Sequence, residues 1–321
     1  MSLTMSQAHG RWSRVRREAG LSVAILALAT FLSVPLSVAQ ASFPGTNGLL
    51  TFDVYRDTTS IGNETCSTRN CQILRMYSLR PGARRVAPVP TCRSRECQDR
   101  YPAWSADGRR LAFMRLIFLD PGNAEPTRQD LGVFRARAEA RVLEQDAAVP
   151  AWGPQGELTF LRGTRLVIRS PDGTVSSLAT GAGIPNHPDW SSRGTIVYTK
   201  AQGDRPAGLF TLRPGGKPRR IARDARDPSW APDGRRIVFT RLSKPGLWVI
   251  STRGGRPRRI GTYSGDSPTW SPNGRWIAFY RRRSIYVVRP DGSRIRRLYR
   301  LRRPGLLNHL SWQSLQRKDQ R

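Results

Sequence analysis

Histidine, cysteine and acidic residues are scarce in this sequence of 321 residues. It has three histidines, of which His9 belongs to the N-terminal segment 1–41, so His187 and His309 remain for any histidine chemistry in the rest of the chain. The Gly-x-Ser-x-Gly turn that carries the nucleophile of many hydrolases is absent. We therefore assign no catalytic residue, no metal site and no cofactor, and a non-enzymatic function is favoured.

The N-terminal segment 1–41 is predicted to be a signal peptide. Four arginines precede an uncharged apolar run from Leu21 to Val38, and Ala39-Gln40-Ala41 has the small-x-small pattern of a cleavage site. The run is also long enough for an uncleaved membrane anchor, although Pro35 favours cleavage. We expect an exported protein, extracellular or on the periplasmic side of the cell envelope.

All four cysteines lie in one region of the chain. They form two Cys-x4-Cys pairs: Cys66, Cys71, Cys92 and Cys97. An even number of cysteines in an oxidising compartment predicts disulfides, with a tetrathiolate metal site as the alternative. Bridges within each pair are the simplest of the three possible connectivities.

The most informative feature that is present is a repeat marked by tryptophan. Its members recur at a nearly constant spacing: Trp104, Trp152, Trp190, Trp230, Trp270 and Trp312. The first five are each followed by a turn ending in glycine and an apolar strand, most clearly at Asp107-Gly108, Asp233-Gly234 and Asn273-Gly274, where tolerance of positive φ suits a tight hairpin. A second pair of strands follows each hairpin. Four short strands in about 40 residues are typical of a propeller blade.

One blade is divided between the two ends of the chain. Residues 44–52 resemble a hairpin end and a second strand without its first strand, and residues 310–312 resemble a first strand without a successor. Joining them leaves no open sheet edge. The predicted fold is all-β: a six-bladed β-propeller of four-stranded blades over residues 42–315, its ring closed by pairing of the C-terminal strand with the N-terminal blade. Residues 316–321 form a basic tail.

The repeat Pro-x-Trp-Ser-x-Asp-Gly-Arg-Arg-x-x-x-Phe resembles that of the TolB-like six-bladed β-propellers, a WD40-like β-propeller repeat family. The resemblance covers about residues 43–315 and implies the fold. It does not imply one function, because such blades serve as scaffolds, ligand binders and covers for enzymes. TolB itself has an α/β domain before its propeller, for which we expect no space here. A role in the Tol envelope system is therefore not carried over.

Blade geometry sorts the connections onto two faces. We name the face with the connections after second and fourth strands the loop face, and the opposite one the turn face. Both cysteine pairs and the insertion at 116–130 fall on the loop face. Because specificity is usually placed on loops, we predict a partner-binding loop there, at Leu116, Ile117, Phe118 and Leu119. The alternative is that these loops vary in length and sequence without a binding role, and that the cysteines only stabilise them by disulfides.

The formal net charge is +31, and the N-terminal segment 1–41 contributes four arginines and one glutamate to it, so +28 lies on the remainder. Such a surface attracts polyanions. Many arginines follow turns on the turn face: Arg84, Arg85, Arg109, Arg110, Arg219, Arg220, Arg235, Arg236, Arg256, Arg258, Arg259, Arg275, Arg294, Arg296 and Arg297. They could attract an anionic envelope polymer or lipid surface, or protect outermost strands from edge-to-edge pairing. Nucleic acid is an unexpected partner for an exported protein, and we expect a monomer.

The position three residues before each tryptophan should lie near the mouth of the central channel. It holds Tyr101, Val149, His187, Asp227, Ser267 and His309. We predict ligand binding by Tyr101, His187, Asp227 and His309, with ordinary solvated polar residues as the alternative. His187 and Asp227 belong to consecutive blades, whereas His309 lies across the ring from His187. The tryptophans themselves should pack between neighbouring sheets.

Three functions are compatible with these features. The first is an exported, non-enzymatic propeller that binds an unknown protein or envelope ligand through its loop face. The second is a propeller enzyme with its site at the channel mouth. The third is a structural envelope protein attached by its basic face.

Overall fold

The computed structural model describes residues 43–57, 72–92, 97–119, 126–135, 138–202, 205–241, 243–302 and 305–316, all within one compact unit, Val38–Arg321. The predicted signal peptide, Cys66 and Cys71 lie outside these residues. Among the described residues, no helix of the length and apolarity needed to cross a membrane occurs.

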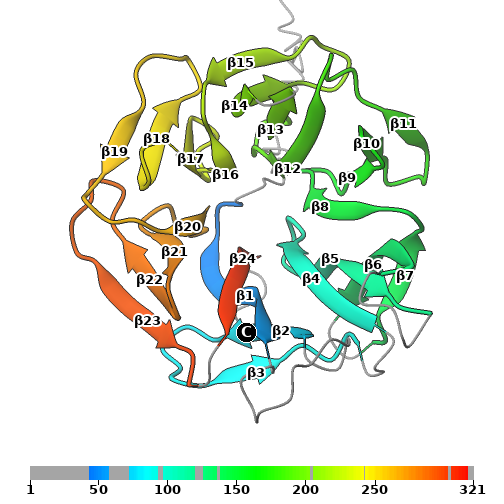
Figure 1. Ribbon diagram of the computed structural model, residues 1–321, viewed down its shortest axis with the longest axis horizontal. Helices are drawn as coiled ribbons and strands as arrows, with labels where there is room; N and C mark the ends of the chain where they lie inside the picture. The colour runs from blue at the N-terminus through cyan, green and yellow to red at the C-terminus, as the bar shows by residue number, and fades with distance from the viewer. Residues whose placement is uncertain are drawn as a thin grey trace, which may run out of the picture. The chain divides into compact units, whose positions relative to one another are not determined.

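The described chain forms six antiparallel sheets of four strands each, arranged as a ring (Figure 1). From the centre outward, blade 1 is β24 (Leu306–Leu315), β1 (Thr46–Asp57), β2 (Gln72–Leu79) and β3 (Val86–Pro88). Blade 2 is β4 (Cys97–Trp104), β5 (Arg110–Ile117), β6 (Arg128–Arg135) and β7 (Arg141–Glu144). Blade 3 is β8 (Ala148–Trp152), β9 (Leu158–Arg162), β10 (Arg165–Arg169) and β11 (Val175–Ser177).

The remaining blades keep the same order. Blade 4 is β12 (Ile184–Trp190), β13 (Ile196–Gln202), β14 (Arg205–Leu212) and β15 (Arg219–Ala222). Blade 5 is β16 (Arg226–Trp230), β17 (Arg236–Thr240), β18 (Leu247–Ser251) and β19 (Arg258–Ile260). Blade 6 is β20 (Asp266–Trp270), β21 (Ile277–Arg281), β22 (Ser284–Val288) and β23 (Arg296–Arg300). The predicted fold class is confirmed.

The ring closes as the repeat predicted, because the C-terminal strand β24 pairs antiparallel with β1 as the innermost strand of blade 1. Gln313 on β24 reinforces this closure. Its side-chain oxygen accepts the Leu49 N–H at 2.9 Å, and its amide nitrogen donates to the Gly108 carbonyl at 2.7 Å. A Cβ on Gly108 would lie 2.1 Å from the Ser314 carbonyl oxygen, so glycine is required at this turn of blade 2.

The core is built from aromatic side chains that repeat from blade to blade. Trp190, Trp230 and Trp270 are at most 2% exposed. Each second strand adds one wholly buried aromatic ring: Phe52, Phe113, Phe160, Tyr198, Phe239 and Phe279. The indole N–H groups of Trp104 and Trp190 donate to threonines of the preceding blade, at 3.0 and 2.8 Å. The tryptophans therefore lie between sheets, where they join neighbouring blades.

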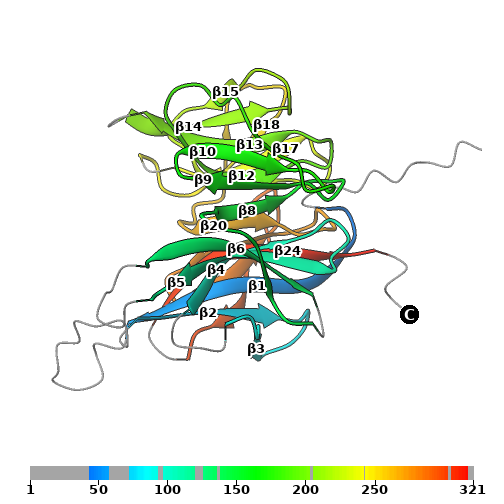
Figure 2. The ribbon, with the colours of Figure 1, turned by 90° about the vertical axis from the view of Figure 1, so that its right-hand side faces the viewer.

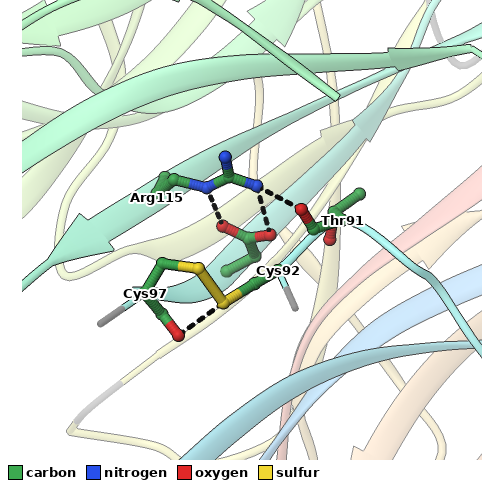
Figure 3. The surroundings of a disulfide bond; sticks show 5 residues. Thr91, Cys92, Cys97 and Arg115 are labelled. Atoms are coloured by element: carbon green, nitrogen blue, oxygen red, sulfur yellow. Dashed lines mark hydrogen bonds and ion pairs between the residues drawn. A yellow bond between two sulfur atoms is a disulfide. The ribbon is translucent and has the colours of Figure 1, made fainter. Parts of the chain in front are cut away.

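Figure 2 shows the ring from the side, with the loop face on the left, where β1 ends and β2 begins, and the turn face on the right, where β24 ends. On the loop face, a disulfide joins Cys92 and Cys97 in the connection from blade 1 to blade 2 (Figure 3). Beside it, Arg115 forms a bidentate ion pair with the buried Asp99, at 2.9 and 3.0 Å, and donates to the Thr91 carbonyl. This cluster links Thr91 and Cys92 to strands β4 and β5 of blade 2.

Candidate functional site at the channel mouth

The innermost strands share a backbone irregularity at the position three residues before the tryptophan. The pairing of first and second strands shifts register there in every blade, for example between Arg100 and Ala103. The residue at this β-bulge has a left-handed backbone, with φ of 55, 51, 48, 48, 45 and 41° at Tyr101, Val149, His187, Asp227, Ser267 and His309. Such φ values are uncommon outside glycine and rare for a β-branched residue such as Val149.

These six residues, which we name the mouth ring, all line one central cavity of about 140 Å³. Phe43, which precedes β1, also lines it and belongs to the same apolar cluster as Ala106 and Trp190. The four residues predicted to bind a ligand, Tyr101, His187, Asp227 and His309, are thus brought together around one space. Their role as ligand-binding residues remains a prediction.

A buried Asp-His pair stands on one side of this cavity. His309 Nδ1 lies 2.9 Å from Asp53 Oδ1, and Asp53 is wholly buried. The Tyr101 backbone N–H donates to the same oxygen at 3.4 Å, whereas Asp53 Oδ2 has no hydrogen-bond partner among the described residues. An unpartnered buried carboxylate oxygen is costly, so the pair marks a polar site inside the propeller.

Asp53 was not among the predicted site residues, although the repeat contains a signal for it. The residue after the recurrent aromatic of each second strand is Met114, Leu161, Thr199, Thr240 or Tyr280 in the other five blades. Only blade 1 places an acid there, following Phe52. A charged residue at a position that is otherwise uncharged, in a buried strand, indicates a specific role.

Tyr101 connects the two histidines across the channel. Its ring centroid lies 3.6 Å from that of His309 and 6.2 Å from that of His187. The Arg100 guanidinium carbon lies 4.7 Å from the Tyr101 ring centroid. Burial, which Arg100 partly opposes, raises the pKa of Tyr101, so its phenol remains protonated and can donate a hydrogen bond at neutral pH.

The second histidine faces Asp227. His187 Nε2 lies 3.6 Å from Asp227 Oδ1, in agreement with the expected approach of these consecutive blades. Burial lowers the pKa of His187, and the attraction of Asp227 only partly opposes this. The imidazole is therefore neutral at pH 7 and can both donate and accept a hydrogen bond.

Below the mouth ring, side chains that precede the tryptophans join successive blades. Asp189 Oδ2, Ser229 Oγ and Ser311 Oγ accept the backbone N–H of Trp230, Trp270 and Trp104 of the next blade, at 2.7, 3.4 and 3.1 Å. Burial raises the pKa of Asp189 to about 7 against the lowering effect of its hydrogen bonds.

Chemically, the cavity offers the phenol of Tyr101, the imidazoles of His187 and His309, and the carboxylates of Asp189 and Asp227. In the described part of the chain, no three His, Cys, Asp or Glu side chains are grouped to hold a metal ion. The arrangement suits hydrogen bonding to a small polar group, supplied by a free ligand or by a side chain of a partner.

No protein-family model and no curated protein matches the sequence. Solved structures do match. TolB from Acinetobacter baumannii superposes with a TM-score of 0.63 at 15% identity, over 83% of this chain and 67% of that one. The chain folds as a TolB-like six-bladed β-propeller.

The TolB-like propeller is also similar to proteins of other kinds. A chain of the nidogen/laminin complex matches with a TM-score of 0.61 at 13% identity, over 83% of this chain and 99% of that one. The tricorn protease matches with a TM-score of 0.56 at 16% identity, over 81% of this chain and 27% of that one. At such identities the likeness shows the fold alone.

The predicted partner loop of the TolB-like propeller is divided between core and surface. Strand β5 continues through Ile117, and Leu116 and Phe118 are 7% and 3% exposed in a cluster with Met114. Leu119 is 67% exposed. The apolar surface that this segment presents is thus mainly that of Leu119.

Arginines on the turn face of the TolB-like propeller have contacts that the sequence did not indicate. Arg110 and Arg236 lie over the indoles of Trp152 and Trp270 in the next blade, at 4.3 and 4.9 Å from the ring centroids. Arg219 and Arg258 donate to the backbone carbonyls of Thr252 and Pro290 of the next blade, at 3.4 and 2.7 Å. Part of the positive charge of this face thus has a structural role between blades.

Proposed function

We propose that this protein is an exported, non-enzymatic binding or scaffold propeller that engages a protein or cell-envelope ligand through its loop face, around the mouth of the central channel. Export rests on the predicted signal peptide. The absence of a hydrolase nucleophile motif from the sequence favours binding over catalysis.

One observation carries the proposal: exposed apolar side chains lie on the loop face, at the start of two innermost strands and after one second strand. Ile184 begins β12, Leu306 begins β24, and Leu119 follows β5; their exposed fractions are 57%, 57% and 67%. Ile184 and Leu306 lie three residues before His187 and His309 of the mouth ring, so these exposed apolar side chains precede residues that line a cavity with polar groups. This combination favours an interaction site on the loop face.

The described cluster around the disulfide supports the same face. The Cys92–Cys97 bond ties Cys92 to the start of β4, and the Arg115–Asp99 pair joins β5 to β4. Residues that are already held in place lose less entropy when a partner binds over them. The described loop-face end of blade 2 therefore offers such a held surface.

Site-specific photo-crosslinking in the producing cells tests the proposal. Benzoylphenylalanine is placed at Leu119 or Ile184 of the full chain, and in matched controls at Val142 or Val175. The control residues are 44% and 37% exposed on outermost strands, near turn-face connections. We expect one discrete adduct from the first two positions and none from the controls.

Adducts at the control positions alone, or of equal yield at all four, would reject binding through the loop face. Monitoring the yield of soluble protein for each variant separates a failure to fold from a failure to bind. Identification of the adduct by mass spectrometry names the partner.

A second candidate, an enzyme at the channel mouth, is favoured by the Asp53–His309 pair. A buried carboxylate bonded to one imidazole nitrogen is the arrangement that orients a general base. Hydrolysis of p-nitrophenyl acetate by the wild type and by His309→Ala tests it. Saturable turnover that is lost in the variant would support an enzyme and contradict the non-enzymatic proposal, whereas equal slow rates would support the proposal.

A further inference from the structure

A second concave site lies on blade 6, away from the channel. It is a groove of about 410 Å³ that begins at the β21–β22 turn on the loop face and runs beside β23. Five arginines line this arginine groove together with Ser284 and Tyr286: Arg281, Arg282, Arg283, Arg297 and Arg300. Arg297, which the sequence grouped with the turn-face arginines, thus shares a site with the loop-face arginines.

None of the described residues that line the arginine groove is acidic. Among the described residues, none of its five guanidinium groups forms an ion pair with a carboxylate. Arg283 donates a hydrogen bond to the Leu301 carbonyl at 3.2 Å, while its buried Nε has no partner in the part of the chain that the structure describes. Five like charges around one groove repel each other unless an anion binds between them.

Blade 3 provides an internal comparison for this turn. Arg162 and Arg165 flank the two-residue turn between β9 and β10, just as Arg281 and Ser284 flank that between β21 and β22. In blade 3 the first turn residue is Gly163, with φ 57°, as expected for a tight hairpin. In blade 6 an arginine occupies the same left-handed position: Arg282, with φ 53°.

The two turns also differ in how their charge is neutralised. Arg162 pairs with Glu144 at 2.7 Å, whereas the equivalent Arg281 has no described acidic partner. Blade 6 therefore places the middle one of three consecutive arginines at a position that favours glycine, and among the described residues no carboxylate pairs with them. Neither feature stabilises the hairpin itself.

We propose that the arginine groove is a binding site for a phosphate-bearing anion. Guanidinium groups bind phosphate oxygens bidentately, and the hydroxyls of Ser284 and Tyr286 add further donors. The site is separate from the channel mouth and does not depend on the proposed partner. Its ligand can be a free phosphate compound or the headgroup of an anionic lipid, which offer the same chemistry.

Calorimetric titration of the full chain with inorganic pyrophosphate, at constant ionic strength, tests the site. We expect saturable binding of one pyrophosphate. Affinity should fall at least tenfold in Arg297→Gln/Arg300→Gln. The control Arg253→Gln/Arg256→Gln removes the same charge from exposed turn-face positions and should retain affinity.

A further variant, Arg282→Gly, separates binding from folding. It gives the turn the residue that blade 3 has, so its thermal midpoint should be no lower than that of the wild type, while its affinity for pyrophosphate falls. Absence of saturable binding to the wild type, or equal losses in the groove and control variants, would overturn the proposal.

Vesicles distinguish the two sources of phosphate. Binding to phosphatidylglycerol vesicles but not to phosphatidylcholine vesicles, displaced by pyrophosphate and lost in Arg297→Gln/Arg300→Gln, would support the site and identify a lipid headgroup. Pyrophosphate binding that is lost in this variant, without vesicle binding, would support the site with a soluble or polymeric phosphate. Vesicle binding unaffected by the variant would count against the site.

Discussion

At the scale of single residues, the mouth ring stores backbone strain. All six of its residues have positive φ, and none of them is glycine. Histidine and aspartate can accept this conformation with modest cost, but valine cannot, because its branched Cβ crowds the backbone. Blade 3 therefore carries a strained residue at a position where four of the other blades carry histidine, aspartate or serine.

Replacement of Val149 by asparagine should relieve this strain. We expect the free energy of unfolding of Val149→Asn to rise by about 1 kcal/mol, since asparagine is among the residues that best tolerate a left-handed backbone. Urea denaturation measures the change. Val175→Asn, at an edge-strand position without positive φ, should show no gain. A free energy of unfolding for Val149→Asn that does not exceed that of the wild type would contradict the account.

Asp189 should make stability depend on pH. Its pKa of about 7 in the folded protein lies above the ordinary value of an aspartate, so the folded state binds the proton more tightly than the unfolded chain. The resulting stability is complete below about pH 4 and is lost as the pH rises toward 7.

The variant Asp189→Asn replaces the titrating carboxyl group by a neutral amide, whose oxygen can still accept the Trp230 N–H. Its unfolding free energy should exceed that of the wild type by at least about 1.4 kcal/mol at pH 8, and should match it near pH 4. Urea midpoints at both pH values provide the test. Parallel pH profiles of the two proteins would show that Asp189 is not the titrating group.

Prediction from sequence succeeded at this scale wherever a residue recurs in each blade. The mouth ring was located by counting back from the tryptophans, because the repeat fixes that position in every innermost strand. Asp53 was missed because it occurs once, and its pairing with His309 joins positions 256 residues apart. The stack of Tyr101 on His309 depends on side-chain rotamers, which the repeat does not fix.

At the scale of strands and connections, buried ion pairs and arginines hold neighbouring elements together. Arg115 on β5 joins Asp99 on β4 to the Thr91 carbonyl in the connection from blade 1. The strands themselves were predictable from alternating apolar residues and Asx-Gly turns. The bridging contacts were not, because the abundance of arginine conceals which ones are paired.

Removal of one member of the Arg115–Asp99 pair should be costly. Asp99 is 2% exposed, so Arg115→Met leaves a buried charge uncompensated, and we expect a loss of about 3 kcal/mol in the free energy of unfolding. The double variant Arg115→Met/Asp99→Asn should recover most of this loss. Urea denaturation of the single and the double variant provides the test. Equal losses in their free energy of unfolding would mean that the ion pair contributes little beyond packing.

At the scale of the whole molecule, the spacing of the tryptophan repeat determines two features. These are the closure of the ring by β24 and the sorting of the connections onto two faces. The tryptophan spacing predicted six blades and a blade divided between the ends, because a ring must pair its last strand with its first sheet. What the ring binds could not be predicted in this way, since binding depends on residues that break the repeat. The sequence placed Leu119 on the loop face, but the exposure of Leu119, Ile184 and Leu306 is known only from the folded chain.

The affinity of the crosslinked partner for two matched triple variants tests the central claim most directly. Leu119→Ser/Ile184→Ser/Leu306→Ser removes the exposed apolar side chains of the loop face. Val142→Ser/Leu143→Ser/Val175→Ser removes three exposed side chains from outermost strands. We predict that the first variant binds at least tenfold more weakly than the wild type and that the second binds equally well. Equal affinity of the first variant and the wild type would contradict binding through the loop face.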